Sequence, residues 1–216
     1  MSTVQVDAIN ESTTNAGVTV DGVLIKDGTV DGVDVSGITS AGLVKLASQT
    51  VSSATASVIF DNFVDNSLYS LYKIYTHHLL PATDNTNFWG KFRSGGASGS
   101  DMTGTYHRAG TAMIADTSGS TVFGSQSSSN YAPLVPNNGA NADESLIVEM
   151  TYRVSDGTNG ITSIKSDTAF QNTDDNVKNQ VVTHFLESTT AATGIKFQME
   201  SGNIASGTIT VYGVLK

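Results

Sequence analysis

The sequence predicts an all-β protein, with a short intertwined N-terminal β neck followed by a jelly-roll-like antiparallel β-sandwich. Three observations support this fold class. Short runs alternate apolar and polar residues, Gly, Asn and Asp mark turns between the runs, and no segment has a convincing amphipathic helical period. Hydrophobic residues make up 38% of the 216 positions and charged residues 14%, so the composition is not that of a disordered chain.

Glycines interrupt residues 16–42 at short intervals. Between them lie aliphatic runs of only a few residues, and strands this short do not form an independent sheet with a core. We expect several copies to wind around a common axis, and a homotrimer is the simplest such assembly. The residues predicted to form the shared interior of this neck are Val18, Val20, Val23, Ile25, Val30, Val33, Val35 and Ile38. The alternative is that the segment forms two edge hairpins of the sandwich.

The pattern changes after about residue 45, where the apolar runs lengthen and glycines become fewer. Residues 1–45 are therefore predicted to be an N-terminal attachment arm and trimerising β neck, of which the polar residues 1–15 order only on docking. Residues 46–216 are predicted to be the sandwich, a knob of roughly eight to ten strands. Two segments, 144–154 and 194–200, alternate most clearly, which is typical of antiparallel strands with one buried face. Their predicted buried residues are Leu146, Val148, Met150, Tyr152, Val154, Ile195, Phe197 and Met199.

Charge and cysteine content exclude several classes of function. The net charge of −9 repels phosphate backbones, so we expect no nucleic-acid partner. No basic amphipathic stretch, long apolar run or signal peptide is evident, so we expect no membrane insertion and synthesis in the cytoplasm. Cysteine is absent, which excludes disulfides and thiolate metal sites.

The histidines give no catalytic or metal-binding pattern. His77 and His78 are adjacent, so in a strand they would point to opposite faces and could not chelate one metal ion. His107 and His184 are isolated in the sequence. We therefore expect ordinary surface or core histidines, and no metal ligands.

The carboxylates likewise indicate no enzyme. Asp143–Glu144 and Asp174–Asp175 lie in predicted loops, and no hydrolase, zinc-protease or P-loop motif is present. A pair placed across a groove to cleave glycans cannot be identified by sequence. Oxygen-rich segments at 84–87, 156–160 and 172–176 could hold Ca²⁺, but none has EF-hand spacing, and Asx-turns explain them more simply. We expect no catalytic residue, no metal and no cofactor.

Aromatic residues are the remaining candidates for a binding surface. Trp89 is the only tryptophan, and with Tyr106 and Tyr131 it could contact a glycan. Aromatic side chains are also the normal filling of a sandwich core, and the core interpretation is favoured for Trp89.

Three segments carry a resemblance to a known group of proteins. "TTNAGVTVDGVLIKDGTVDG" resembles the glycine-punctuated neck of bacteriophage tail fibres, spikes and head fibres, particularly marine ones. "YKIYTHHLLPATDNTNFWGKFRSGG" and "GIKFQMESGNIASGTITVYGVLK" resemble a β-sandwich module of virion structural proteins. The resemblance covers about half of the chain.

This resemblance implies a structural component of a virion. Such proteins are typically homotrimers, attached through the N-terminus to a capsid, tail or adaptor protein, with an outward knob that contacts host-surface glycans in some cases. It carries no catalytic signature. The main alternative is a secreted or cell-surface carbohydrate-binding module, and a third interpretation is a small glycan-cleaving enzyme.

Overall fold

A computed structural model describes residues 42–115, 120–155, 161–172 and 176–216, with only the backbone for residues 114–115 and 120–129, and the backbone of four short strands between residues 18 and 34. The chain divides into two compact units, Met1–Gly42 and Leu43–Lys216. Strands dominate both units, and the described helices are two short 3-10 turns, Gly96–Ser98 and Ala142–Glu144. The predicted all-β sandwich class is confirmed.

The N-terminal unit contains an antiparallel sheet in which neighbouring strands in the sequence pair with one another. Its strands are β1 (Val18–Val20), β2 (Val23–Lys26), β3 (Thr29–Val30) and β4 (Val33–Asp34). Their described residues pair with one another as a separate four-stranded sheet.

Strand register places most of the aliphatic residues of this sheet on one face. Val18 pairs with Ile25, which pairs with Val30, which in turn pairs with Val33. Paired residues of antiparallel strands, and residues two apart along one strand, share a face. Six of the eight predicted neck residues therefore occupy one face: Val18, Val20, Val23, Ile25, Val30 and Val33. The other two, Val35 and Ile38, lie outside the described residues, and the predicted intertwining of several chains stays a prediction.

The second unit contains thirteen strands, more than the eight to ten that the sequence predicts. They are β5 (Leu43–Val51), β6 (Ser57–Phe60), β7 (Tyr69–Pro81), β8 (Thr86–Ser94), β9 (Ser100–Asp101), β10 (Tyr106–Ala115), β11 (Ser120–Ser129), β12 (Ala132–Asn138), β13 (Ile147–Arg153), β14 (Ile161–Gln171), β15 (Val177–Glu187), β16 (Gly194–Met199) and β17 (Ile204–Leu215). The first of them begins at Leu43, so the predicted boundary after residue 45 falls inside β5.

Eight of these strands have jelly-roll connectivity. One sheet contains the order β5-β17-β7-β13, and the sheet facing it has the order β6-β16-β8-β12. When these eight strands are numbered one to eight in sequence order, the first sheet has the order 1-8-3-6 and the facing sheet has the order 2-7-4-5. Each connection crosses between the sheets except the one from β8 to β12, which is the double Greek key of a jelly roll.

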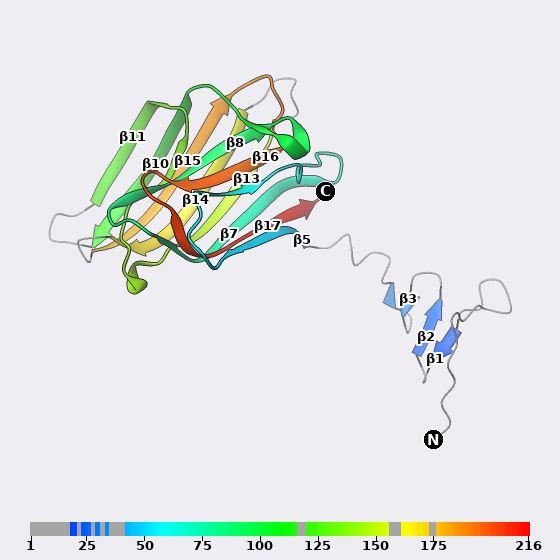
Figure 1. The fold of residues 1–216 in the computed structure, drawn as a ribbon. Helices are drawn as coiled ribbons and strands as arrows, with labels where there is room; N and C mark the ends of the chain where they lie inside the picture. The colour runs from blue at the N-terminus through cyan, green and yellow to red at the C-terminus, as the bar shows by residue number, and fades with distance from the viewer. Residues whose placement is uncertain are drawn as a thin grey trace. The chain divides into compact units, whose positions relative to one another are not determined.

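The remaining strands widen one sheet only. β14, β15, β10 and β11 continue from β13 and make that sheet eight strands wide, with β11 at one edge and β5 at the other (Figure 1). The facing sheet gains only the two-residue strand β9, paired with β8. The larger sheet therefore extends beyond β12, the edge strand of the smaller sheet.

The core lies between the two sheets and follows the period-2 pattern of the sequence. On β13 and β16 the residues predicted to be buried are buried, except Val154, which is only partly buried. Aromatic rings meet across the core: Phe92 of β8 and Tyr152 of β13, which belong to facing sheets, have ring centroids 5.4 Å apart. Tyr72 and Tyr152 are almost fully buried, and their hydroxyls hydrogen-bond to the backbone at Asp65 and Gly194.

Candidate ligand-binding pocket

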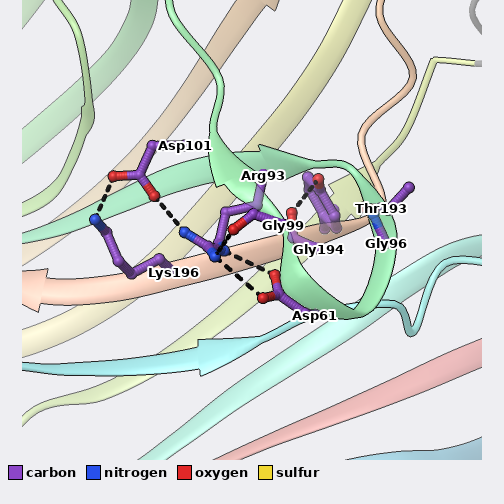
Figure 2. Close-up of polar contacts among 9 residues, drawn as sticks. Asp61, Arg93, Gly96, Gly99, Asp101, Thr193, Gly194 and Lys196 are labelled. Atoms are coloured by element: carbon purple, nitrogen blue, oxygen red, sulfur yellow. Dashed lines mark hydrogen bonds and ion pairs between the residues drawn. The ribbon is translucent and has the colours of Figure 1, made fainter.

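The most concentrated group of charges surrounds Arg93 on β8 (Figure 2). Its guanidinium donates to both carboxylate oxygens of Asp61, at 2.7 and 3.1 Å, to Asp101 Oδ1 at 2.6 Å, and to the Gly99 carbonyl. Lys196 Nζ donates to the other oxygen of Asp101. These residues, which we call the Arg93 cluster, connect the end of β6, β8, β9 and β16.

The charges of the Arg93 cluster pair with one another and hold neighbouring segments together. Hydrogen bonds from Lys196 and Arg93 outweigh the effect of burial and lower the pKa of Asp101. Hydrogen bonds to Asp61 are the largest cause that raises the pKa of Arg93. The Asp101 carboxylate is thus held in the charged, hydrogen-bonded form, whereas a general acid needs a raised pKa. The cluster fixes the loop 94–101 against the smaller sheet.

The carboxylates named from the sequence have structural surroundings where they are described. Glu144 is buried, and its Oε2 accepts a hydrogen bond from the Asn141 backbone N–H in a capping box at the 3-10 turn. Asp174 and Asp175 lie outside the described residues. In the segment 84–87, Asp84 accepts from the Ala140 N–H and Asn87 from the Asn137 N–H. No group of three or more potential metal ligands occurs in the part of the chain that the structure describes.

The histidines occupy three different environments. His77 and His78 are both exposed. The reason is a β-bulge in β7, where the two residues His78 and Leu79 lie opposite the single residue Gly207 of β17. His78 has a φ of 48° at this bulge. The expected alternation of these two histidines is therefore broken. His107 stacks on Phe185 with their ring centroids 5.1 Å apart. His184 is fully buried.

A pocket of about 270 Å³ lies where β12 meets the extension strands β10 and β15 of the larger sheet. Its described lining residues are Arg108, Pro133, Pro136, Asn137, Lys178, Gln180 and Val182. Two of these are cations and none is a carboxylate, although the chain as a whole carries a net charge of −9. The pocket therefore concentrates positive charge in an acidic protein.

Strand register explains why these residues gather. On β15 the even-numbered residues face inward, since Gln180, Val182 and His184 are buried, and Lys178 continues this series toward the end of the strand. Arg108 on β10 pairs directly with His184 and shares its face. Among the described elements, β12, the edge strand of the smaller sheet, contacts β10, β14 and β15 here, and the pocket forms at that junction.

Hydrogen bonds from the larger sheet hold β12 in place. The Leu134 carbonyl accepts from Gln180 Nε2 at 2.9 Å and from Ser166 Oγ at 3.3 Å. Both donors are buried. The wall of the pocket is thus fixed by side chains that line or underlie it, which makes the pocket largely preformed.

His184 lies beside the pocket as a neutral buried group. Burial and, to a smaller extent, the positive charge of Arg108 lower its pKa to about 4, and the Pro133 backbone opposes the shift. Neither ring nitrogen makes a hydrogen bond of normal geometry within the described residues. A buried polar group in this condition is unusual, and a strongly shifted pKa next to a pocket is a feature of functional sites.

The three aromatic candidates for glycan contact have different positions. Trp89 faces outward from β8, on the side opposite Phe88 and Phe92, and stacks on Tyr131 with their ring centroids 3.5 Å apart. The favoured interpretation of Trp89 as a core residue is therefore wrong, because the alternation of β8 buries its neighbours. Tyr106 is buried, and its hydroxyl accepts a hydrogen bond from the Phe92 N–H at 2.8 Å, so Tyr106 is not placed to contact a ligand.

Sequence reasoning missed the pocket residues. Arg108 lies on β10, whereas Lys178 and Gln180 lie on β15. The paired residues of these two strands, from Ala115 with Val177 to Tyr106 with Leu186, are far apart in the sequence, and nothing local to either segment indicates that they meet. The available signal was the shared inward side of Lys178, Gln180 and His184 in the segment 177–187. Three polar or charged residues share one side of an otherwise apolar strand only when something polar faces them.

Comparisons with known proteins give no identification. No protein-family model, no curated protein and no solved structure matches the chain. In the described part of the chain, no helix has the length and hydrophobicity needed to cross a bilayer.

Proposed function

We propose that the protein is a structural component of a bacteriophage virion: a homotrimeric fibre, spike or capsid-decoration protein. In this proposal the N-terminal segment attaches to a capsid, tail or adaptor protein, and the jelly-roll sandwich is an outward knob used in host adsorption. The resemblance of the neck and of two knob segments to virion proteins supports it. Jelly rolls are also common in viral coat proteins and in lectins.

The register of the N-terminal sheet carries the proposal. Its strands are two to four residues long, and six aliphatic residues share one face. A single layer of such strands has no core of its own. Other copies of the same short sheet, arranged around a threefold axis, would cover these residues with equivalent ones.

The proposal is tested on the particle itself. A full-length chain and a chain beginning at Gly42 are each supplied to particles that lack the native protein, and incorporation is measured by mass spectrometry of purified virions. We expect the full-length chain to be incorporated and the shorter chain to be absent. Equal incorporation of both chains would place attachment in the sandwich, and absence of both would contradict a virion role.

A carbohydrate-binding module is the second candidate function. It is favoured by the outward stack of Trp89 on Tyr131, since paired aromatic rings at a surface are suited to sugar contact. A glycan array probed with the isolated protein tests it, with Trp89→Ala as the variant expected to lose binding. Binding that persists in Trp89→Ala would exclude this surface.

A further inference from the structure

We propose that the pocket between β10, β12 and β15 binds the carboxylate-bearing sugar of an acidic glycan, with Arg108 and Lys178 as the residues that receive the carboxylate. This ligand class deepens the adsorption role proposed above. The choice of a glycan rests on that role, whereas the preference for an anion rests on the pocket alone.

The charge distribution favours an anion at this position. Arg108 and Lys178 both line the pocket, and no carboxylate does so among the described residues. An arginine fork matches the geometry of a carboxylate, and a lysine adds a point charge.

The rest of the lining suits a sugar ring better than a bare ion. Pro133, Pro136 and Val182 offer apolar surface for C–H groups, while Asn137 and Gln180 offer amides for hydroxyl groups. A volume of about 270 Å³ is just below the range of about 300–1,000 Å³ found for drug-sized ligands. The pocket therefore has room for one monosaccharide unit, with the remainder of the glycan outside.

His184 shares the face of Arg108 but is not among the residues that line the pocket. Its ring is buried beside Arg108, and neither nitrogen has a hydrogen bond of normal geometry within the described residues. A polar group left unsatisfied in this way destabilises the empty protein. The preference for an anion therefore rests on Arg108 and Lys178, which line the pocket, and not on His184.

The experiment is a titration of the full-length protein with sodium glucuronate, followed by calorimetry or by NMR chemical shifts. Glucose serves as the neutral sugar, and inorganic sulfate as the anion without a sugar. We expect glucuronate to bind at millimolar concentration, glucose to bind at least tenfold more weakly, and added salt to weaken glucuronate binding. Arg108→Ala and Lys178→Ala should each weaken glucuronate binding at least tenfold.

Two matched variants control for the loss of one positive charge. Arg153 and Lys165 are exposed on β13 and β14, so Arg153→Ala and Lys165→Ala should bind glucuronate like the parent. Thermal melting of all four variants shows which of them still fold. If Arg108→Ala does not fold, Lys178→Ala alone tests the proposal.

Binding that is equal for glucuronate and glucose, or unchanged in Lys178→Ala, would overturn the proposal. Sulfate binding as tightly as glucuronate would overturn the sugar part of it. These results test only the pocket. The virion role is tested separately, by measuring incorporation of the protein into particles.

Discussion

The N-terminal sheet and the sandwich use the same local pattern, in which apolar and polar residues alternate along short strands. In the sandwich, a second sheet covers the inner face, and residues such as Ile74, Val148 and Phe197 are fully buried within one chain. In the N-terminal sheet, the strands between Val18 and Asp34 have one layer, with six aliphatic residues on one face. The comparison teaches that alternation specifies which face of a sheet is apolar, and that in the sandwich a facing sheet is what buries that face.

A first prediction tests how strongly the sandwich is held together by its own contacts. Arg93→Ala removes the centre of the Arg93 cluster and leaves Asp61 without its principal partner in a largely buried position. Breaking such a pair should lower the free energy of unfolding by roughly 3 kcal/mol. Urea unfolding followed by circular dichroism measures the change.

The control is the exposed pair of Lys73 and Glu149, in which the side chains are 27% and 51% exposed. Lys73→Ala should lower the free energy of unfolding by less than about 1 kcal/mol, because water screens the charges. Equal losses in Arg93→Ala and Lys73→Ala would show that the cluster does not hold the loop 94–101 in place.

A second prediction concerns the response of the sandwich to acid. The pKa of His184 falls from its ordinary value of 6.5 to about 4 in the folded protein. The unfolded chain therefore takes up this proton first as the pH decreases. The contribution of His184 to the free energy of unfolding is complete above pH 6.5. It is lost progressively as the pH falls from 6.5 to about 4, and it changes no further below pH 4. The full loss is up to about 3 kcal/mol.

Unfolding free energies measured from pH 7 to pH 4 test this prediction. His184→Gln should lose less stability over the interval than the parent protein does. A parent and a His184→Gln variant with the same pH dependence would contradict the assigned burial.

A third prediction separates the two units and has the smallest expected effect on the sandwich. A chain beginning at Gly42 retains all of β5, which pairs with β17 from Leu43 to Val51. It should melt cooperatively, within a few degrees of the full-length protein, because domains of this size bury enough surface to fold alone. Differential scanning calorimetry measures the melting temperature. A truncated chain that is unfolded would show that the sandwich depends on the N-terminal unit.

The sequence was informative about the sandwich because alternation is a local property. Residues 144–154 and 194–200 predict both the strands and their buried faces, and only the position of Val154 is less buried than expected. β11 and β14 give a weaker sequence signal, since Ser and Thr dilute the apolar pattern in "STVFGSQSSS" and "ITSIKSDTAFQ". The end of β12 is obscured in the same way by Pro136 and the two asparagines after it.

The pocket could not be predicted, because it depends on long-range pairing. Arg108 meets His184 only through the register of β10 with β15, and Pro133 meets both only because the smaller sheet ends at β12. The position of Trp89 shows the same limit. Its strand was predicted, but the outward face of that residue became clear only once Phe88 and Phe92 were known to face the core.

Light scattering of the full-length protein tests most directly whether other chains cover the N-terminal sheet. Val23→Asp adds a charge to the aliphatic face, whereas Thr19→Asp adds the same charge to the opposite face of the neighbouring strand. Three unpaired charges buried around one axis are costly. We expect a trimer mass for the parent and for Thr19→Asp, and a smaller mass for Val23→Asp. A parent that is monomeric at micromolar concentration, or two variants with the same mass, would contradict the account.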